Sequence, residues 1–491
     1  MHKDLAVILT PGELDQAFFS ILRCLRAHGS FYIKDQRLVR IITTSETVHL
    51  KEVDSVYLAT FLSQNMKFLK KDKTGKTHQL DCPEALCRSF LSLGNWELPQ
   101  LKNIICAPTI KPNGELLIKE GFDEESGLYM HKNKDFVFFN MAPHPTLEDA
   151  KEAAFALCDL IRDFPFRDPP SRSVALSAVL TGLVRSSLPT APLHAFTAPK
   201  MGTGKSLLAA VVSLIVTGHE TSVISQSTNE SEESKRLLAV LQDGHPIVCI
   251  DNIERPFGSS TLCSILTETS YKGRVLGKTQ TAIYPTSILF LATGNNLVFQ
   301  GDISTRVVLS SLDAEVQRPE EREFAVNLHH FIPQHRGILV QYALTILHAY
   351  NQAGRPKQVF KPFGRFEEWS NWIRSALVWC GMADPCASRK QLEDDDPVRI
   401  TLAKTLEAWF KLVGNLDFRI RDVYNKAVME CNELILECFS EISNTPTKNA
   451  NICLKKVGQY FRANNRRIEG GYRAIRCGSY QNADTWRVEK I

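Results

Sequence analysis

The sequence contains no apolar run that is long enough to cross a membrane. Its longest apolar runs lie near residues 173–184 and 207–216, whereas a membrane-spanning helix needs about 20 such residues. The residues that follow Met1 also lack the pattern of a secretory signal peptide. We therefore expect both runs to form buried helices of a cytoplasmic protein that has no membrane partner.

Cysteine pairs with a metal-binding spacing are missing as well. The 13 cysteines are scattered, and the two closest pairs are Cys82 with Cys87 and Cys380 with Cys386. Neither pair has the Cys-x-x-Cys spacing or the neighbouring histidine of a zinc site. This distribution favours reduced thiols inside apolar cores.

A strong overall charge is absent too. The sequence has 58 lysines and arginines against 54 aspartates and glutamates, a formal net charge of +4, and a hydrophobic content of 44%. These values are ordinary for a soluble globular protein, so only a local cluster of charge can indicate a partner. The 491 residues exceed what one core can hold and predict about two to four domains.

The order of elements predicts a central α/β domain with smaller parts on both sides. The proline-rich segment Phe164–Pro170 breaks the chain. From Pro192 to about Leu312 strands and helices alternate, which predicts a parallel sheet covered by helices. We expect an α/β accessory module, an α/β core, a helical lid and linker, and a basic C-terminal domain, over residues 1–165, 166–318, 319–440 and 441–491.

A glycine-rich turn stands at the start of the core. An apolar run precedes it, a helical run follows it, and the turn itself reads Pro199, Lys200, Met201, Gly202, Thr203, Gly204, Lys205, Ser206. Such a strand–turn–helix order predicts a phosphate-binding loop, in which backbone N–H groups face an anion at a helix N-terminus. Lys205 then reaches the β- and γ-phosphates and Ser206 holds Mg²⁺. The usual pattern begins with glycine, whereas this sequence has Pro199.

Polar residues end the next buried strands. The apolar run Pro246–Ile250 leads to Asp251, and a carboxylate at that point of a parallel sheet is suited to hold the water shell of Mg²⁺. Glutamate, a base for the attacking water, often follows, but here the residue is Asn252. Asparagine can orient water without accepting its proton, so Glu254 or the phosphate itself would have to do so. This difference predicts slow hydrolysis rather than loss of nucleotide binding.

Two further residues complete the expected site. Asn295 follows the buried strand 287–293 and is suited to position the attacking water. Arg306 stands just before the last strand of the core, where an arginine can reach the γ-phosphate of a neighbouring copy in a ring. The alternative for Arg306 is a local ion pair with Asp302.

Five motifs in this order resemble the AAA+ ATPase core of primase-associated replicative helicases. They are Gly-Thr-Gly-Lys-Ser, Ile-Asp-Asn-Ile-Glu, Arg-Val-Leu-Gly-Lys, Ala-Thr-Gly-Asn-Asn-Leu and Gly-Asp-Ile-Ser-Thr-Arg. Such helicases are carried by phages and bacterial mobile elements and are related to superfamily III helicases. The resemblance covers about 165–330 and implies a hexameric ring that uses ATP and Mg²⁺ to move along single-stranded or forked DNA. No primase or zinc-binding portion precedes residue 165, so a primase partner would be a separate chain.

The resemblance also implies which residues contact DNA. In this family a basic hairpin lines the channel of the ring, and here the hairpin contains Lys272, Arg274 and Lys278, with Tyr271 for base stacking. A surface hairpin with solvated charges is the alternative. Arg318 and Arg322 are candidates for sensing nucleotide from the lid, or else ordinary charges at a helix start.

The end of the chain is more basic than the rest. Residues 449–491 contain nine lysines and arginines against three acidic residues. A helix followed by two strands is typical of a winged helix, and its charge suits a DNA backbone. A packing domain with a basic surface is the alternative. The candidate DNA contacts are Lys455, Lys456, Arg466, Arg467 and Arg473.

These expectations together describe an ATP-dependent DNA helicase. Two other classes stay open at this point. A nucleotide-switched DNA-binding regulator would bind ATP and hydrolyse it slowly, which Asn252 favours. An AAA+ loader or remodeller of protein complexes would grip polypeptide in its channel, whereas the basic hairpin and the basic end favour nucleic acid.

Overall fold

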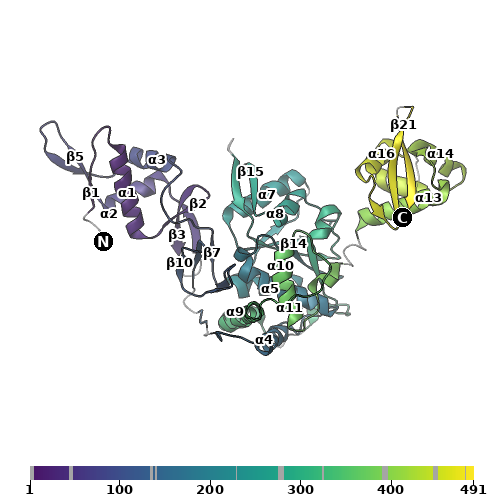
Figure 1. Cartoon of the computed structure of the whole chain (residues 1–491), viewed down its shortest axis with the longest axis horizontal. Helices are drawn as coiled ribbons and strands as arrows, with labels where there is room; N and C mark the ends of the chain where they lie inside the picture. The colour runs from purple at the N-terminus through teal and green to yellow at the C-terminus, as the bar shows by residue number, and fades with distance from the viewer. Residues whose placement is uncertain are drawn as a thin grey trace.

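The computed structural model describes residues 5–491 apart from several short segments. These segments are 44–47, 133–135, 139–140, 228, 275–280, 323, 325, 390–395, 446–451 and 482. Figure 1 shows an N-terminal module, a central core and a C-terminal unit in chain order. Within the described part of the chain, none of the helices combines the length and hydropathy needed to span a lipid bilayer.

A five-stranded parallel sheet forms the centre of the core. Its strands, in spatial order, are β13 (Ser222–Ser225), β14 (Ile247–Ile253), β17 (Leu289–Asn295), β12 (Leu193–Ala198) and β18 (Val307–Ser311). Every residue of β12 and β18 is buried, as expected for strands covered on both faces. The predicted parallel sheet is thus confirmed.

Helices cover this sheet, and a small hairpin leaves it. Between β12 and β14 the chain forms two helices, and a third helix and the hairpin lie between β14 and β17. The helices are α6 (Lys205–Thr217), α7 (Glu230–Asp243) and α8 (Ser260–Thr267), and the hairpin strands are β15 (Ser270–Arg274) and β16 (Thr281–Pro285). A short 3₁₀ turn, η2 (Gly301–Arg306), precedes β18.

Further helices on both sides of this segment join the same core. They are α4 (Leu147–Leu160), α5 (Pro169–Val184), α9 (Leu328–Gln352), α10 (Glu367–Trp369) and α11 (Ser375–Trp379). Thr146 begins α4 with a capping box, because its hydroxyl accepts from the N–H of Asp149 and the Asp149 carboxylate accepts in return. The expected boundary at 165/166 separates α4 from the core, whereas the structure packs α4 against α9.

The buried Arg336 of α9 connects three parts of the core. Its guanidinium donates hydrogen bonds to the carbonyl oxygens of Ile215 at 2.9 Å, Val216 at 2.8 Å and Cys106 at 2.8 Å. Two of these carbonyls lie in the last turn of α6, whose final carbonyl groups lack partners within the helix. The guanidinium also lies 4.6 Å from the ring centre of Phe136. Burial lowers the pKa of Arg336 to about 10.

The N-terminal module has its own apolar core between Val7 and Leu98. Three helices pack with two small sheets of order β1-β5-β6 and β2-β3-β4. Its elements are β1 (Ala6–Ile8), α1 (Leu14–His28), β2 (Phe31–Lys34), β3 (Arg37–Thr43), β4 (Val48–Glu52), α2 (Ser55–Asn65), β5 (Lys67–Lys71), β6 (Thr77–Leu80) and α3 (Glu84–Ser92). Short strands connect it to the core: β7 (Asn103–Ile105), β8 (Thr109–Ile110), β9 (Leu116–Leu117), β10 (Gly121–Asp123) and β11 (Leu128–Met130).

The C-terminal unit is built around one apolar cluster between Leu402 and Val488. Its helices are α13 (Pro397–Val413), α14 (Ile420–Met429), α15 (Glu433–Ser443) and α16 (Leu454–Ala463). An antiparallel sheet completes it with β19 (Phe418–Arg419), β20 (Ile468–Glu469), β21 (Tyr472–Tyr480) and β22 (Ala483–Lys490). The expected boundary at 440 falls inside α15, so the packed unit extends further toward the N-terminus than the basic stretch indicates.

Replacing Arg336 by methionine should reduce the free energy of unfolding by about 3 kcal/mol, because three buried carbonyl groups lose a charged donor. Urea denaturation of both proteins measures the difference. The matched control is Arg88→Met, because Arg88 is exposed on α3 and, among the described residues, pairs only with Glu84; a change below about 0.5 kcal/mol is expected there. Equal stability of wild type and Arg336→Met would contradict the connecting role of this residue.

Candidate phosphate-binding site

The turn between β12 and α6 has the geometry of an anion cradle. Gly202 and Gly204 have φ angles of 72° and 104°, in the left-handed region that favours glycine. Thr203 is buried, and its hydroxyl donates to the carbonyl oxygen of Lys200 at 2.8 Å. Pro199 and Met201 are exposed at the outside of the turn. The loop therefore turns tightly enough to place backbone N–H groups at the start of α6.

Lys205 links the turn to the end of the neighbouring strand β17. Its ammonium group donates to the side-chain oxygen of Asn295 at 2.7 Å and to the carbonyl oxygen of Lys200 at 3.0 Å. Burial lowers the pKa of Lys205 below its ordinary value, and the charge of Asp251 acts in the opposite direction. The cation is thus held beside the turn with a polar amide opposite it.

Ser206 lies beside the carboxylate at the end of β14. The Ser206 hydroxyl donates to Asp251 Oδ1 at 3.0 Å, and the Thr293 hydroxyl donates to the same oxygen. A carboxylate with hydroxyl neighbours is an oxygen donor set that suits Mg²⁺, which keeps several of its waters when bound to protein. Among the described residues, no group of three or more His, Cys, Asp or Glu could hold a metal ion, so these oxygens form the best candidate.

Thr293 is a site residue that the sequence did not indicate. Its hydroxyl contacts Asp251 and also accepts from the backbone N–H of Asn252 at 3.2 Å. Asn252 has a φ angle of 54°, and the register between β14 and β17 shifts at this point, between Ile250 and Ile253. The only available signal was a threonine at the end of a buried strand, directly before Gly294 and Asn295.

Asn252 and Glu254 contact each other next to Asp251. The Asn252 amide donates to Glu254 Oε1 at 2.9 Å, and both side chains are exposed. Because the carboxylate of Glu254 lies within one hydrogen bond of Asn252, the two residues form a polar pair at the mouth of the site. An amide can orient a water molecule and a nearby carboxylate can accept its proton, so the pair contains the groups that general base catalysis requires.

A segment after β18 lies against the phosphate loop. A methyl group added at Gly202 would lie 2.9 Å from Cβ of Glu320 and 3.0 Å from its backbone nitrogen. Lys200 Nζ donates to the carbonyl oxygen of Val316 at 3.1 Å. Glu320 belongs to the 3₁₀ turn η3 (Pro319–Glu321). The turn between β12 and α6 therefore has two glycines in the left-handed region and packs closely against η3.

The two arginines that flank η3 have local partners. Arg318 pairs with Glu321 at 2.7 Å, and Arg322 donates to the carbonyl oxygen of Asp163 at 2.6 Å. The second terminal nitrogen of Arg322, Nη1, is buried without a hydrogen-bond partner among the described residues. Arg322 thus joins the segment after β18 to the residues that follow α4, and a sensing role for either arginine stays a prediction.

An apolar cavity of about 250 Å³ lies next to the same loop. The end of α4, Phe164, Phe324 and the α9 residues Phe331 and Tyr342 contribute to its walls. A methyl group added at Gly204 would lie 3.2 Å from the ring of Phe164, so one wall touches the turn directly. Aromatic walls beside a phosphate loop offer a flat, apolar surface to a ring system.

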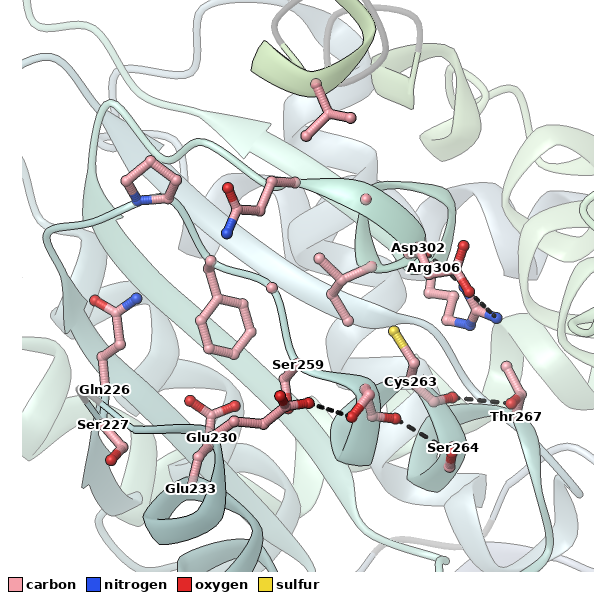
Figure 2. A pocket seen from close by; sticks show the side chains of 18 of the residues that line it. Gln226, Ser227, Glu230, Glu233, Ser259, Cys263, Ser264, Thr267, Asp302 and Arg306 are labelled. Carbon is pink, nitrogen blue, oxygen red and sulfur yellow. Dashed lines mark hydrogen bonds and ion pairs between the residues drawn. The ribbon is translucent and has the colours of Figure 1, made fainter. Parts of the chain in front are cut away.

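A second cavity, polar and open, has a volume of about 1000 Å³ between α7, α8 and η2. Figure 2 shows Glu230 and Glu233 on one side of it and Arg306 on the other. Arg306 Nη1 donates to the carbonyl oxygen of Asp302 at 2.5 Å, and the Asp302 carboxylate lies 3.7 Å from Nη2. The local pairing is therefore present within one copy, while Arg306 still lines an open cavity.

The basic hairpin β15–β16 is partly described. Lys272 and Arg274 are exposed on β15, whereas Lys278 lies outside the described residues. Tyr271 packs against the core rather than standing free. A methyl group at Gly273 would lie 2.1 Å from the side chain of Leu238 on α7, so strand β15 packs closely on that helix.

Ion pairs compensate much of the positive charge in the C-terminal unit. Arg467 pairs with Glu469 at 3.1 Å and Arg473 pairs with Glu489 at 2.8 Å. Lys456 donates to the carbonyl oxygen of Ser443 at 3.1 Å. Lys455 and Arg466, in contrast, are exposed and form no ion pair within the described ranges.

Comparisons with known proteins find only distant structural similarity. No family model and no curated protein matches the chain. Two solved structures entitled apo forms of the NrS-1 C-terminal region are 13% and 11% identical, with TM-scores of 0.43 and 0.41, over 95% of this chain and 98% of theirs. A structure entitled "SCCmec type IV Cch - active helicase" is 13% identical, with a TM-score of 0.38, over 93% of this chain and 91% of its own. A similarity this low carries no argument about the fold or the function of this chain.

The substitution Thr293→Val should weaken binding of a nucleoside triphosphate with Mg²⁺ by about tenfold, because Asp251 loses a hydroxyl donor and the N–H of Asn252 loses its acceptor. Isothermal titration calorimetry with Mg²⁺, and again with a chelator, measures the effect. Binding without Mg²⁺ should change less. Thr60→Val on the remote helix α2 is the control, and an identical Mg²⁺ dependence of Thr293→Val and wild type would argue against this placement.

Proposed function

We propose that the chain is an ATP-dependent DNA helicase, a translocase that acts in the replication of a phage or mobile element. The observation that carries the proposal is the contact of the phosphate loop with two strand ends, Lys205 with Asn295 and Ser206 with Asp251. A cation, a hydroxyl and a carboxylate around a glycine turn are the groups that hydrolysis of a triphosphate requires.

In this proposal each residue of the site has a separate task. The N–H groups of the turn and Lys205 bind the phosphates, while Ser206 and Asp251 would hold Mg²⁺, which supplies charge neutralisation at the β- and γ-phosphate oxygens. Asn295, which already faces Lys205, orients the attacking water. Asn252 is a candidate to help orient this water, and Glu254 or the phosphate itself would accept its proton.

The aromatic cavity beside the turn supports the nucleoside part of the proposal. Phe164, which lines the cavity, also lies beside Gly204 of the turn, and we propose that the base of a bound nucleotide enters the cavity while its phosphates lie on the turn. The choice of ATP among the nucleotides follows from the resemblance of the sequence motifs to AAA+ ATPases.

We further propose that hydrolysis takes place between adjoining copies in a hexameric ring. Arg306 lines an open cavity on η2, where an arginine can complete the site of a neighbour. Lys272, Arg274 and Lys278 would grip single-stranded DNA in the channel, and the C-terminal unit would act as a winged helix on forked DNA. A primase would then be a separate partner.

A nucleotide-switched DNA-binding regulator is the second candidate. One observation favours it: Asn252 stands where a carboxylate would be the base, and the nearby Glu254 is hydrogen-bonded to it. Such a protein would bind ATP and DNA without separating strands. Unwinding of a forked duplex distinguishes the two functions, and a protein that hydrolyses ATP without binding DNA would instead indicate a remodeller of protein complexes.

Replacing Lys205 by alanine should reduce ATP hydrolysis by about 100-fold or more, because the phosphates lose the cation that stabilises their developing charge. A coupled phosphate-release assay and a forked-duplex unwinding assay measure both activities. The control Lys357→Ala, at an exposed position, should leave both unchanged. Hydrolysis at the wild-type rate by Lys205→Ala would refute the assignment of the site.

Arg306 can be tested by mixing two inactive variants. We expect Lys205→Ala and Arg306→Ala each to lose hydrolysis alone, and an equimolar mixture to recover a measurable fraction of it. Recovery follows because a mixed ring contains some interfaces with an intact Lys205 on one side and an intact Arg306 on the other. If Arg306 only pairs with Asp302 inside its own copy, mixing restores nothing.

A further inference from the structure

The hairpin β5–β6 of the N-terminal module concentrates positive charge. Its first strand and its turn together contain five lysines, Lys67, Lys70, Lys71, Lys73 and Lys76. Residues 70–79 are all exposed, and within the described part of the chain none of the five lysines forms an ion pair. With Asp72 as the single acidic residue of the hairpin, five lysines against one aspartate give +4, as much as the formal net charge of the entire chain.

The one carboxylate of the hairpin is used inside the turn. Asp72 accepts hydrogen bonds from the backbone N–H groups of Thr74 at 2.8 Å and Lys76 at 3.0 Å. It also accepts from the Thr74 hydroxyl at 2.6 Å and contacts the imidazole of His78 at 2.9 Å. The hydrogen bonds from Thr74 and His78 hold the pKa of Asp72 at about 2. Asp72 therefore fixes the shape of the turn and does not pair with a lysine.

The lysines point to both sides of the hairpin and around its tip. Lys70 pairs in register with His78 and Lys71 with Thr77, and successive residues of a strand face opposite sides. Phe68 anchors the base of the hairpin in the module's core. Figure 1 shows β5 at the end of the module that lies away from the sheet with the phosphate loop.

This charge differs from that of the C-terminal unit. There Asp484 pairs with both Arg462 and Arg476, and Arg487 pairs with Asp417, so most arginines of this basic stretch have an acidic partner in the fold. The hairpin has the reverse property, because its charge excess in the sequence survives as exposed, unpaired charge in the structure. Charge of this kind is what releases counterions from a polyanion.

We propose that the hairpin β5–β6 is a second nucleic-acid contact, an arm that binds the phosphate backbone independently of base sequence. The proposal rests on the proposed function for its choice of polyanion. A two-stranded ribbon is narrow enough to enter a major groove about 12 Å wide or to lie along a single strand. Cations on both faces and the tip can contact phosphates on either side of the arm, while its hydroxyl and amide groups add hydrogen bonds.

Other polyanions fit the hairpin less well. A flat anionic membrane would contact the cations of one face only, and the tip from Asp72 to Lys76 has no apolar side chain to insert. An acidic protein surface would require matching pockets, whereas the exposed tip is a smooth turn of small and charged residues. The chemistry therefore favours a flexible or grooved polymer of phosphates.

The test removes four lysines at the tip from the full-length chain. The variant K70A/K71A/K73A/K76A and the wild type are titrated, without nucleotide, against labelled single-stranded and duplex 20-mers by fluorescence anisotropy over a range of NaCl concentrations. We expect the Kd at low salt to rise by about tenfold or more, and the slope of log Kd against log salt to fall by about 3 for single strands.

Matched variants separate local charge from overall charge. One control removes four exposed lysines elsewhere in the chain, K51A/K119A/K357A/K361A, and should change Kd by less than about threefold. A second variant keeps the charge of the hairpin, K70R/K71R/K73R/K76R, and should retain binding. Equal thermal unfolding midpoints show that the hairpin variant is folded. Oligonucleotide binding as tight as that of wild type, or an equal loss in the control variant, would overturn the proposal. The proposal would also be overturned if the wild type but not the hairpin variant sedimented with phosphatidylserine vesicles while both proteins bound oligonucleotides equally.

The outcome can be separated from that of the proposed function. If the chain hydrolyses ATP and unwinds a fork but the hairpin variant binds oligonucleotides normally, the arm is refuted and the helicase stands. If the chain lacks hydrolysis but shows hairpin-dependent binding, the arm stands and the helicase is refuted. A wild-type chain that binds neither oligonucleotide refutes both.

Discussion

The candidate site depends on the register of three parallel strands. Because β12, β17 and β14 lie side by side, Ala198 pairs with Asn295, and Asp251 comes to the same edge of the sheet. The turn that follows β12 can then meet a carboxylate and an amide that lie roughly 50 and 100 residues away in the sequence. A shift of one residue in either pairing would turn these side chains to the opposite face and leave the glycine turn without its polar neighbours.

Local chemistry made the turn and its lysine predictable, since strand, glycines and helix are adjacent in the sequence. Asp251 and Asn295 were predictable because each ends an apolar strand. Thr293 was not, because its contact with Asp251 arises from pairing between β14 and β17 and from the irregular backbone at Asn252. Domain limits were also hard to derive, since apolar periodicity shows that a helix buries one face but not which partner covers it.

Positive charge in the sequence gave an equally incomplete prediction. The C-terminal stretch has a clear excess of basic residues, yet folding brings Asp484 and Glu489 from β22 beside arginines of neighbouring elements. The turn of the β5–β6 hairpin keeps its lysines unpaired because its aspartate is bound to the turn's own backbone. Composition counts charges, whereas only the fold decides which of them remain for a partner.

The packing of α4 on α9 has a practical consequence for dissecting the chain. The apolar side of α4, with Ala150, Ala153, Ala154 and Leu157, is fully covered in the core. A fragment cut at the proline-rich segment near 165 would expose the matching face of α9 and aggregate, although it would retain the entire parallel sheet. The shortest soluble fragment that contains the parallel sheet therefore has to start before the capping residue Thr146.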